Sequence, residues 1–424
     1  MHFLIFIINA DFSLSSEPTA YNYTGYSAKY MNQSIDSKIP MVQQSESDSS
    51  ALLYVSHRKS GEYHSSYDFT VKDTTIQKEG ISTNLENSLS YCINSAVLDS
   101  GLQISMSFVN VFTKAEGAIG VCVTNDGHIR VSDSIISTQS KNSNAIHASG
   151  LGGITGRYST IITSGENSPA MSAQKGSSIF CNNCALHTSK KGSPLFQIFG
   201  DSMYISHSYG LAENSHAIIA DGHMDIQIDN TTLNCSLTGN GDDISDASGI
   251  LLKNTSFNID EDKIEYTSFY LKKSLLEINS ETAPMILVDN AYISFTFENS
   301  KVKSKIFLKV KNASEKTVVF FRNCDIEGDI IADEKANLDI SLSNTKFVGA
   351  INPDGKAGHI TFFLNKNSNV TLTGNSNCDS FYSEDRTNSN VIKKSFSLAG
   401  LEEDSSSNLL ISKIMLLLCV YLLI

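Results

Sequence analysis

Three aspartates are the residues of this sequence best suited to acid–base chemistry. They are Asp221, Asp242 and Asp243, the last two following Gly241. Two carboxylates roughly 5 to 9 Å apart can hydrolyse a glycosidic bond, one as the acid and the other as base or nucleophile. Aspartate is also common at solvated turns. The choice between these roles depends on whether the fold brings Asp221 beside the other two.

Cysteine and histidine are the other candidates for chemistry. Cys181-x-x-Cys184 has the spacing of a redox or zinc half-site, but no second cysteine pair completes it. We therefore expect buried thiols or one local bridge there. No nucleophile elbow, phosphate-binding glycine loop, His-Glu-x-x-His motif or EF-hand loop occurs in the sequence.

Seven Asn-x-Ser/Thr sequons suit a glycosylated, secreted chain. Their asparagines are Asn22, Asn32, Asn230, Asn234, Asn254, Asn312 and Asn369.

Composition limits the class of protein. The chain has 424 residues, with 32 basic and 45 acidic side chains and a net charge of −13, which argues against a nucleic-acid partner. It contains 63 Ser and 35 Asn but 6 Pro and no Trp. Ser and Asn compete with the helix backbone for hydrogen bonds and favour turns, so the composition argues against a helix bundle.

The two ends suggest an address outside the cell. Residues 1–16 contain a short apolar run that is typical of a weak secretory signal, with a buried N-terminal strand as the alternative. Residues 409–424 are almost entirely apolar and follow a polar stalk at 386–408. This tail predicts either a glycolipid-anchor signal or a short membrane helix, and a buried or amphipathic tail is a further alternative. Either of the first two would place the protein on the extracellular face of the plasma membrane.

The elements that must position these residues follow an internal repeat of about 23 residues. Its unit is apolar-x-apolar-x-Asn-x-x-apolar, as in Val319-x-Phe321-x-Asn323-x-x-Ile326. A second mark is Ser168-Pro169, which recurs as Ser193-Pro194. The Asn position of the unit is occupied by Asp133, Asn183, Asn230, Asn254, Asn299, Asn323, Asn344 and Asn367.

The repeat predicts an all-β solenoid. Alternation with period two indicates a strand with one buried face, and an Asn that tolerates left-handed backbone indicates a bend after it. One such unit cannot bury its apolar face alone, whereas a stack of units can. We expect about 11–13 coils over residues 96–385, preceded by a Ser-rich cap or irregular region at 17–95. A β-propeller is the alternative, although four strands fit poorly into 23 residues.

The pattern resembles the right-handed parallel β-helix proteins of the pectin-lyase-like superfamily, in which asparagines stack at one bend. The resemblance implies the fold and says little about activity. Gly241-Asp242-Asp243 also resembles an element of the polygalacturonase-type hydrolases. However, Gly222-His223 precedes that element instead of following it, and the Arg-Ile-Lys element is absent.

In such a stack, residues at equal positions in the repeat should lie within about 5 Å of each other in adjacent coils. Asp221 and Asp243 match one coil apart. No histidines match on adjacent coils, so we expect no histidine metal site, no other metal site and no cofactor. Calcium binding by Asp221, Asp225 and Asp229 is less favoured than a solvated face. No cysteines match on neighbouring coils, so the repeat predicts no disulfide between coils.

Together these features favour a membrane-anchored β-helix at the cell surface, acting as an adhesin-like or structural binding rod for carbohydrate or protein. The alternative is a polysaccharide hydrolase or lyase that uses Asp221, Asp242 and Asp243.

Overall fold

Alternating burial defines the strands of the computed structural model. In strand β10 (His128–Ser132), Ile129 and Val131 are buried, whereas His128 and Arg130 face outward and are partly exposed. This alternation is what a sheet with one buried face requires. The structure describes residues 23, 26–56, 67–174, 176–199, 201–237, 246–254, 266–313, 316–365, 367–384, 391–392 and 395–398.

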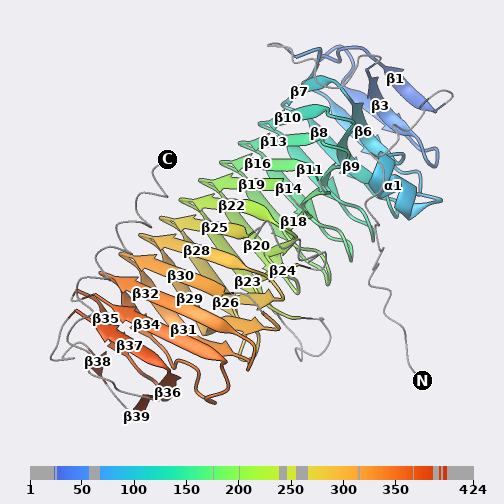
Figure 1. Ribbon diagram of the computed structural model, residues 1–424. Helices are drawn as coiled ribbons and strands as arrows, with labels where there is room; N and C mark the ends of the chain where they lie inside the picture. The colour runs from blue at the N-terminus through green and yellow to red at the C-terminus, as the bar shows by residue number, and fades with distance from the viewer. Residues whose placement is uncertain are drawn as a thin grey trace, which may run out of the picture. The chain divides into compact units, whose positions relative to one another are not determined.

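The chain is a parallel β-solenoid of about 12 turns with about 25 residues per turn, which confirms the predicted fold class (Figure 1). In the most regular part the repeat is slightly longer than predicted, since His128 pairs with Gly153 and Gly153 with Ser178. The chain comprises two compact units, Met1–Gln227 with Thr231–Ala247, and Ile228–Asn230 with Ser248–Ile424.

In the first unit each turn contributes one strand to each of three parallel faces. The first face contains β4 (Phe69–Lys72), β7 (Gln103–Ser107), β10, β13 (Gly153–Arg157), β16 (Ser178–Asn182), β19 (Asp201–Ser206) and the first four residues of β22 (Met224–Asp229). The second contains β2 (Met41–Gln44), β5 (Thr75–Lys78), β8 (Asn110–Thr113), β11 (Ile135–Thr138), β14 (Thr160–Thr163), β17 (Ala185–Thr188), β20 (Tyr209–Glu213) and β23 (Thr232–Ser236). The third contains β1 (Ala28–Met31), β3 (Ser50–Val55), β6 (Ser95–Ser100), β9 (Ile119–Thr124), β12 (Ile146–Ala148), β15 (Met171–Ala173), β18 (Phe196–Ile198) and β21 (Ile218–Asp221).

The second unit has the same arrangement. Its first face contains β25 (Thr267–Lys272), β28 (Ile293–Glu298), β30 (Lys316–Arg322), β32 (Asn337–Ser343), β34 (His359–Leu364) and β37 (Ser380–Ser383). Its second contains β26 (Leu275–Asn279), β29 (Lys301–Lys311), β31 (Asp325–Ala332), β33 (Lys346–Val348), β35 (Asn369–Thr371) and β38 (Val391–Ile392). The third contains β24 (Ile250–Lys253) and β27 (Ile286–Asp289), which pairs with the later part of β29; β36 (Asn375–Cys378) pairs with β39 (Ser395–Leu398). Strands β29 to β32 are longer than those of the first unit.

Each unit has its own apolar core of inward side chains stacked in register. In the first unit Ile104, Ile129, Ile154 and Ile179 form one buried row. In the second unit the rows are rich in phenylalanine, and the buried ring of Phe297 contacts those of Phe295, Phe307 and Phe321. Stacking buries apolar surface that a single turn would leave in water.

Parallel strands also occur within residues 17–95. Strand β3 pairs with β6, and β5 pairs with β8. The single helix of the described chain, α1 (Leu85–Tyr91), interrupts this first part of the repeat; the Asn84 side chain caps it by accepting a hydrogen bond from the Asn87 N–H. The helix lengthens its turn, which is why the sequence showed no regular spacing here.

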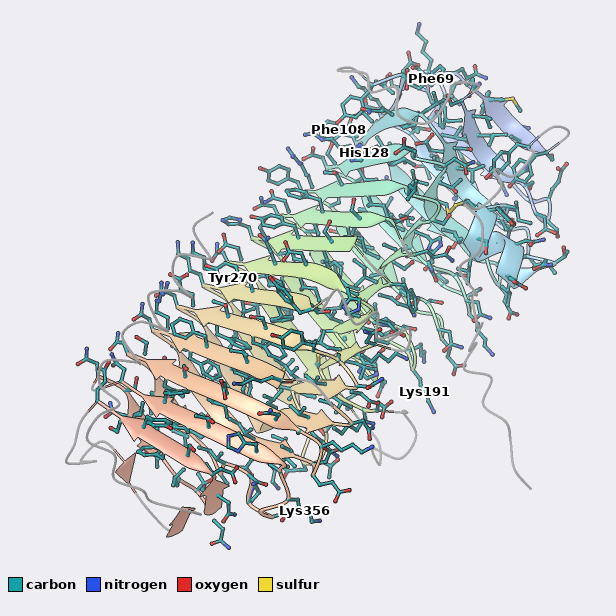
Figure 2. The ribbon with its side chains drawn as sticks, in the orientation of Figure 1. Phe69, Phe108, His128, Lys191, Tyr270 and Lys356 are labelled. Atoms are coloured by element: carbon teal, nitrogen blue, oxygen red, sulfur yellow. A yellow bond between two sulfur atoms is a disulfide. The ribbon has the colours of Figure 1, made fainter. Side chains whose placement is uncertain are left out.

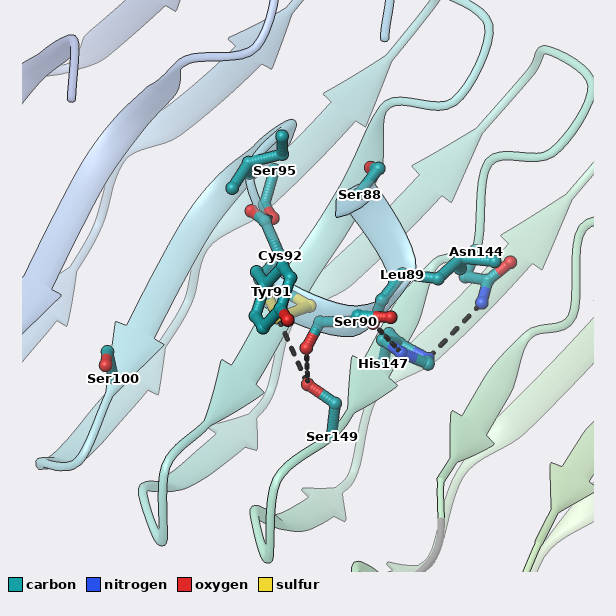
Figure 3. The surroundings of a disulfide bond; sticks show 12 residues. Ser88, Leu89, Ser90, Tyr91, Cys92, Ser95, Ser100, Asn144, His147 and Ser149 are labelled. Carbon is teal, nitrogen blue, oxygen red and sulfur yellow. Dashed lines mark hydrogen bonds between the residues drawn. A yellow bond between two sulfur atoms is a disulfide. The ribbon is translucent and has the colours of Figure 1, made fainter. Parts of the chain in front are cut away.

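A disulfide joins Cys92, at the end of α1, to Cys122 in β9 (Figure 3). The expectation that no cysteines pair between coils was wrong for this reason: Cys92 follows the helical insertion, so its position in the repeat has no counterpart in regular turns. Side chains of β12 and of the residue directly after it also hold the helix. His147 Nε2 lies 2.8 Å from the Leu89 carbonyl, and Ser149 Oγ donates to the Ser90 carbonyl at 3.0 Å.

Candidate functional site

One bend is repeated directly after the strands of the first face from β4 to β32, and we call it the ladder bend. Its central residue has φ between 45° and 57°, a left-handed conformation that asparagine adopts more readily than most residues. The sequence placed six residues of this set correctly, namely Asp133, Asn183, Asn230, Asn299, Asn323 and Asn344. Tyr158 and Lys273, which match the repeat more weakly in sequence, also occupy this bend, and so do Asp73, Phe108 and His207. Asn367, which was also predicted for the ladder, lies three residues after β34 and not directly after it.

Asn254 does not lie at the ladder bend. It follows β24 on the third face, where its carbonyl accepts a hydrogen bond from Asn290 Nδ2 at 3.2 Å. Lys273 takes the predicted place, because the backbone N–H of Asn230 donates to the Lys272 carbonyl at 2.8 Å. Almost two repeat lengths of sequence separate Asn230 from Lys273. Asn254 lies near the middle of that longer turn, so its distance in sequence from Asn230 is close to one predicted repeat.

In the second unit the ladder-bend amides bond to one another. Asn344 Nδ2 donates to Asn323 Oδ1 at 2.7 Å, and Asn323 Nδ2 donates to Asn299 Oδ1 at 3.2 Å. Each amide thus uses part of its hydrogen-bonding capacity along the stack and keeps the remainder for other partners.

A row of buried hydroxyl groups supports this bend. The residue after each ladder position is often Ser or Thr, and its hydroxyl accepts the backbone N–H of the previous turn. Examples are Cys324 N to Thr345 Oγ1 at 3.2 Å and Thr345 N to Ser368 Oγ at 3.1 Å. This row was not predicted, although the Ser or Thr directly after the repeat marker is visible in the sequence.

These residues border a groove of about 280 Å³ in the second unit, which we call the ladder groove. The Lys301 ammonium lies 3.8 Å from the Asp325 carboxylate at its wall. The groove is therefore lined by amides, hydroxyls, ammonium groups and a carboxylate, and it can both donate and accept hydrogen bonds. The lining residues are Asn299, Ser300, Lys301, Asn323, Cys324, Asp325, Asn344, Thr345, Lys346, Asn367 and Asn369.

The predicted aspartates cannot be assembled into a site from the described residues. Asp221 ends β21 and precedes Gly222, whose φ is 108°. Asp242 and Asp243 lie outside the described residues. The structure therefore describes Asp221 alone of the three predicted aspartates.

The sequons differ in accessibility. Asn230, Asn312 and Asn369 are exposed, and Asn369 also lines the ladder groove. Asn32 and Asn234 are half-buried, and Asn32 exchanges two hydrogen bonds with the backbone of Val55. Two sequons remain. Asn254 is only 2% exposed, so a glycan there is incompatible with this packing, and Asn22 lies outside the described residues.

Cys181 and Cys184 are buried free thiols, one of the two states expected for them. The hydrogen bond to Cys184 and burial both raise the pKa of the Cys181 thiol. Among the described residues, no three His, Cys, Asp or Glu side chains are grouped so that they could hold a metal ion.

Three buried ionisable groups were not anticipated. Burial lowers the pKa of Lys78 to about 8, against the opposing effect of Asp48 and Glu46. Burial raises the pKa of Asp99 well above its usual value, and burial lowers the pKa of His147 to about 4. Lys78 has the same strand parity as the inward Ile76, and this signal could have revealed that it points into the core.

No protein-family model matches the chain, and no curated protein matches its sequence. The fold places the chain among parallel β-solenoid proteins. Because a fold alone does not indicate function, the chemistry of the groove must indicate what it binds. In the part of the chain that the structure describes, no helix is both long and apolar enough to cross a membrane; the tail at 409–424 lies outside that part.

Proposed function

We propose that this chain is an adhesin-like β-solenoid displayed on the extracellular face of the plasma membrane, and that its ladder groove binds carbohydrate. The observation that carries the proposal is the groove lining. Its amides, hydroxyls and charged groups supply both donors and acceptors on four turns at a spacing of about 4.8 Å. A polyhydroxylated chain presents a matching series of donors and acceptors.

The same lining favours binding over cleavage. Asp325 is the only carboxylate among the residues that line the groove, and it is engaged by Lys301. Glycoside hydrolysis needs two suitably spaced carboxylates. We therefore propose a binding site rather than an active site.

Lys346 and Asn367 provide the test of the groove, because both are exposed at its wall and neither belongs to the hydrogen-bonded amide series. Replacing both by alanine should weaken binding to the best ligand of an oligosaccharide panel by roughly tenfold or more, since each of the two substitutions removes polar contacts. Binding would be measured by titration calorimetry or by a surface-based assay.

Lys303→Ala is the matched control. Lys303 lies in β29 beyond Lys301, is exposed and does not line the groove. It should leave the affinity unchanged. Equal affinities for the double variant and the wild type would contradict the proposed groove, and failure of the wild type to bind any oligosaccharide would contradict carbohydrate binding as a whole.

The proposed anchor has a separate test. If residues 409–424 direct attachment of a glycolipid, phosphatidylinositol-specific phospholipase should release most of the protein from intact cells. A control surface protein with a lipid anchor should be released in the same samples. Retention on the cells under those conditions would instead indicate a membrane helix.

A further inference from the structure

The outward side of the first face in the first unit carries arginines without acidic neighbours on the same strands. We call the outward side of β7, β10, β13, β16 and β19 the arginine face. The outward positions that pair in register across these five strands hold Arg130 and Arg157 but no aspartate or glutamate. His128 lies on the outward side of β10 (Figure 2). The nearest acids on that turn, Asp126 and Asp133, lie in the bends that flank β10.

Arg130 and Arg157 are unusual in this chain. The sequence contains five arginines and a net charge of −13. Lysines of the second unit pair with acids, for example Lys305 with Glu281 at 2.7 Å and Lys311 with Asp289 at 3.2 Å. By contrast, neither arginine of the arginine face has a carboxylate within ion-pair distance among the described residues. Their charges are thus available to an external anion.

Aromatic stacking fixes one of the two guanidinium groups. The Arg157 Cζ atom lies 5.6 Å from the centre of the Phe180 ring, and Phe180 stacks on Tyr204 at 5.0 Å with an angle of 15° between the rings. Cation–π contact holds the guanidinium against the ring without consuming all its N–H donors. A positioned guanidinium loses less conformational entropy when it binds an anion.

The two arginines are diagonal neighbours. Arg130 pairs with Thr155, which lies two residues before Arg157 on the next strand. The spacing of strands and residues separates their Cα atoms by about 8 Å, so both long side chains can reach one anion. One bidentate guanidinium occupies both oxygens of a carboxylate, whereas a sulfate group has three terminal oxygens and can accept from both arginines and a neighbouring hydroxyl.

The remaining groups of the face suit a sugar chain. Ser105 in β7, Thr155 in β13 and Ser202 in β19 are outward hydroxyls of this face, and His128 Nε2 lies 3.0 Å from Thr155 Oγ1. Burial lowers the pKa of His128, and the positive charge of Arg130 lowers it further, which is consistent with a locally positive surface. The face thus combines two cations, one of which is held against an aromatic ring, with uncharged donors and acceptors.

We propose that the arginine face binds a sulfated glycan, with Arg130 and Arg157 holding a sulfate group and the surrounding hydroxyls contacting the sugar. This site is separate from the ladder groove, and its test does not depend on whether the groove binds carbohydrate.

Heparin is the probe for the test, and affinity is measured with the full chain at several salt concentrations. The Arg130→Gln/Arg157→Gln variant should bind heparin roughly tenfold or more weakly than the wild type and with a shallower dependence on salt. Arg157→Lys, which keeps the charge and loses the planar group, should give an intermediate affinity. Circular dichroism and thermal melting should show that these surface variants fold like the wild type.

Arg322→Gln is the matched control. Arg322 lies on the first face of the second unit, and its Cζ atom is 5.4 Å from the Phe320 ring centre, but its register neighbour is Glu298. This variant should bind heparin like the wild type; an equal loss would overturn the assignment to the arginine face.

Ligand controls separate the possible classes of partner. Desulfated heparin and polygalacturonate should bind much more weakly than heparin. Equal binding of desulfated heparin would overturn the proposal, as would equal or tighter binding of polyglutamate, which would indicate an acidic protein partner instead.

Discussion

Phe297→Ala should lower the free energy of unfolding by about 3–5 kcal/mol, because it leaves a cavity at the centre of a phenylalanine cluster. Phe297 is fully buried, and its ring centre lies 5.0 Å from Phe321, 5.7 Å from Phe307 and 5.8 Å from Phe295. Chemical denaturation followed by fluorescence or circular dichroism would measure the loss.

Phe320→Ala is the control for this prediction. Phe320 lies one residue before Phe321 and points outward, where it contacts Arg322. Its removal should cost about 1 kcal/mol or less. Similar losses for both variants would mean that the inward phenylalanine row does not provide the core of the second unit.

The second large effect is a loss of stability in acid that depends on His147. Burial lowers the pKa of this imidazole from its ordinary value of 6.5 to about 4. The folded state therefore disfavours the proton, so the contribution of neutral His147 is fully present above pH 6.5 and is lost as the pH falls through 6.5 towards 4. The shift corresponds to about 3 kcal/mol over that range.

His147→Gln should flatten this part of the pH profile of unfolding free energy. The substitution removes the titrating group, although it also disturbs the contacts with Leu89 and Ser172. Parallel profiles for wild type and His147→Gln between pH 6.5 and 4 would rule out His147 as the source.

The strands and most of the ladder bend were predictable because their signals are local. Inward alternation and a left-handed residue lie within one short segment, so Asn299, Asn323 and Asn344 could be assigned without knowing the rest of the fold. Their amide hydrogen bonds follow once turns of equal length are stacked. The fold class needed no information beyond this.

Features that depend on the length of a turn were harder to predict. The helix before Cys92 and the long segment around Asn254 change the number of residues per turn, so equal spacing in sequence no longer means equal position in space. The arginine face could not be predicted for another reason. Arg130 and Arg157 have no acidic partner because of the residues on all the neighbouring strands, and a local sequence pattern does not contain those residues.

The regular register of the first unit also bears on how such a chain can evolve. Strands β10, β13 and β16 pair residue for residue at a constant interval, and Ser168-Pro169 recurs at Ser193-Pro194 with the same interval. Each turn presents its neighbours with nearly the same set of backbone and hydroxyl partners. In-frame duplication or deletion of one whole turn would therefore preserve every hydrogen-bonding interface. The spacing of binding groups along the surface can thus change by gene rearrangement, in steps of one turn, without the invention of a new core.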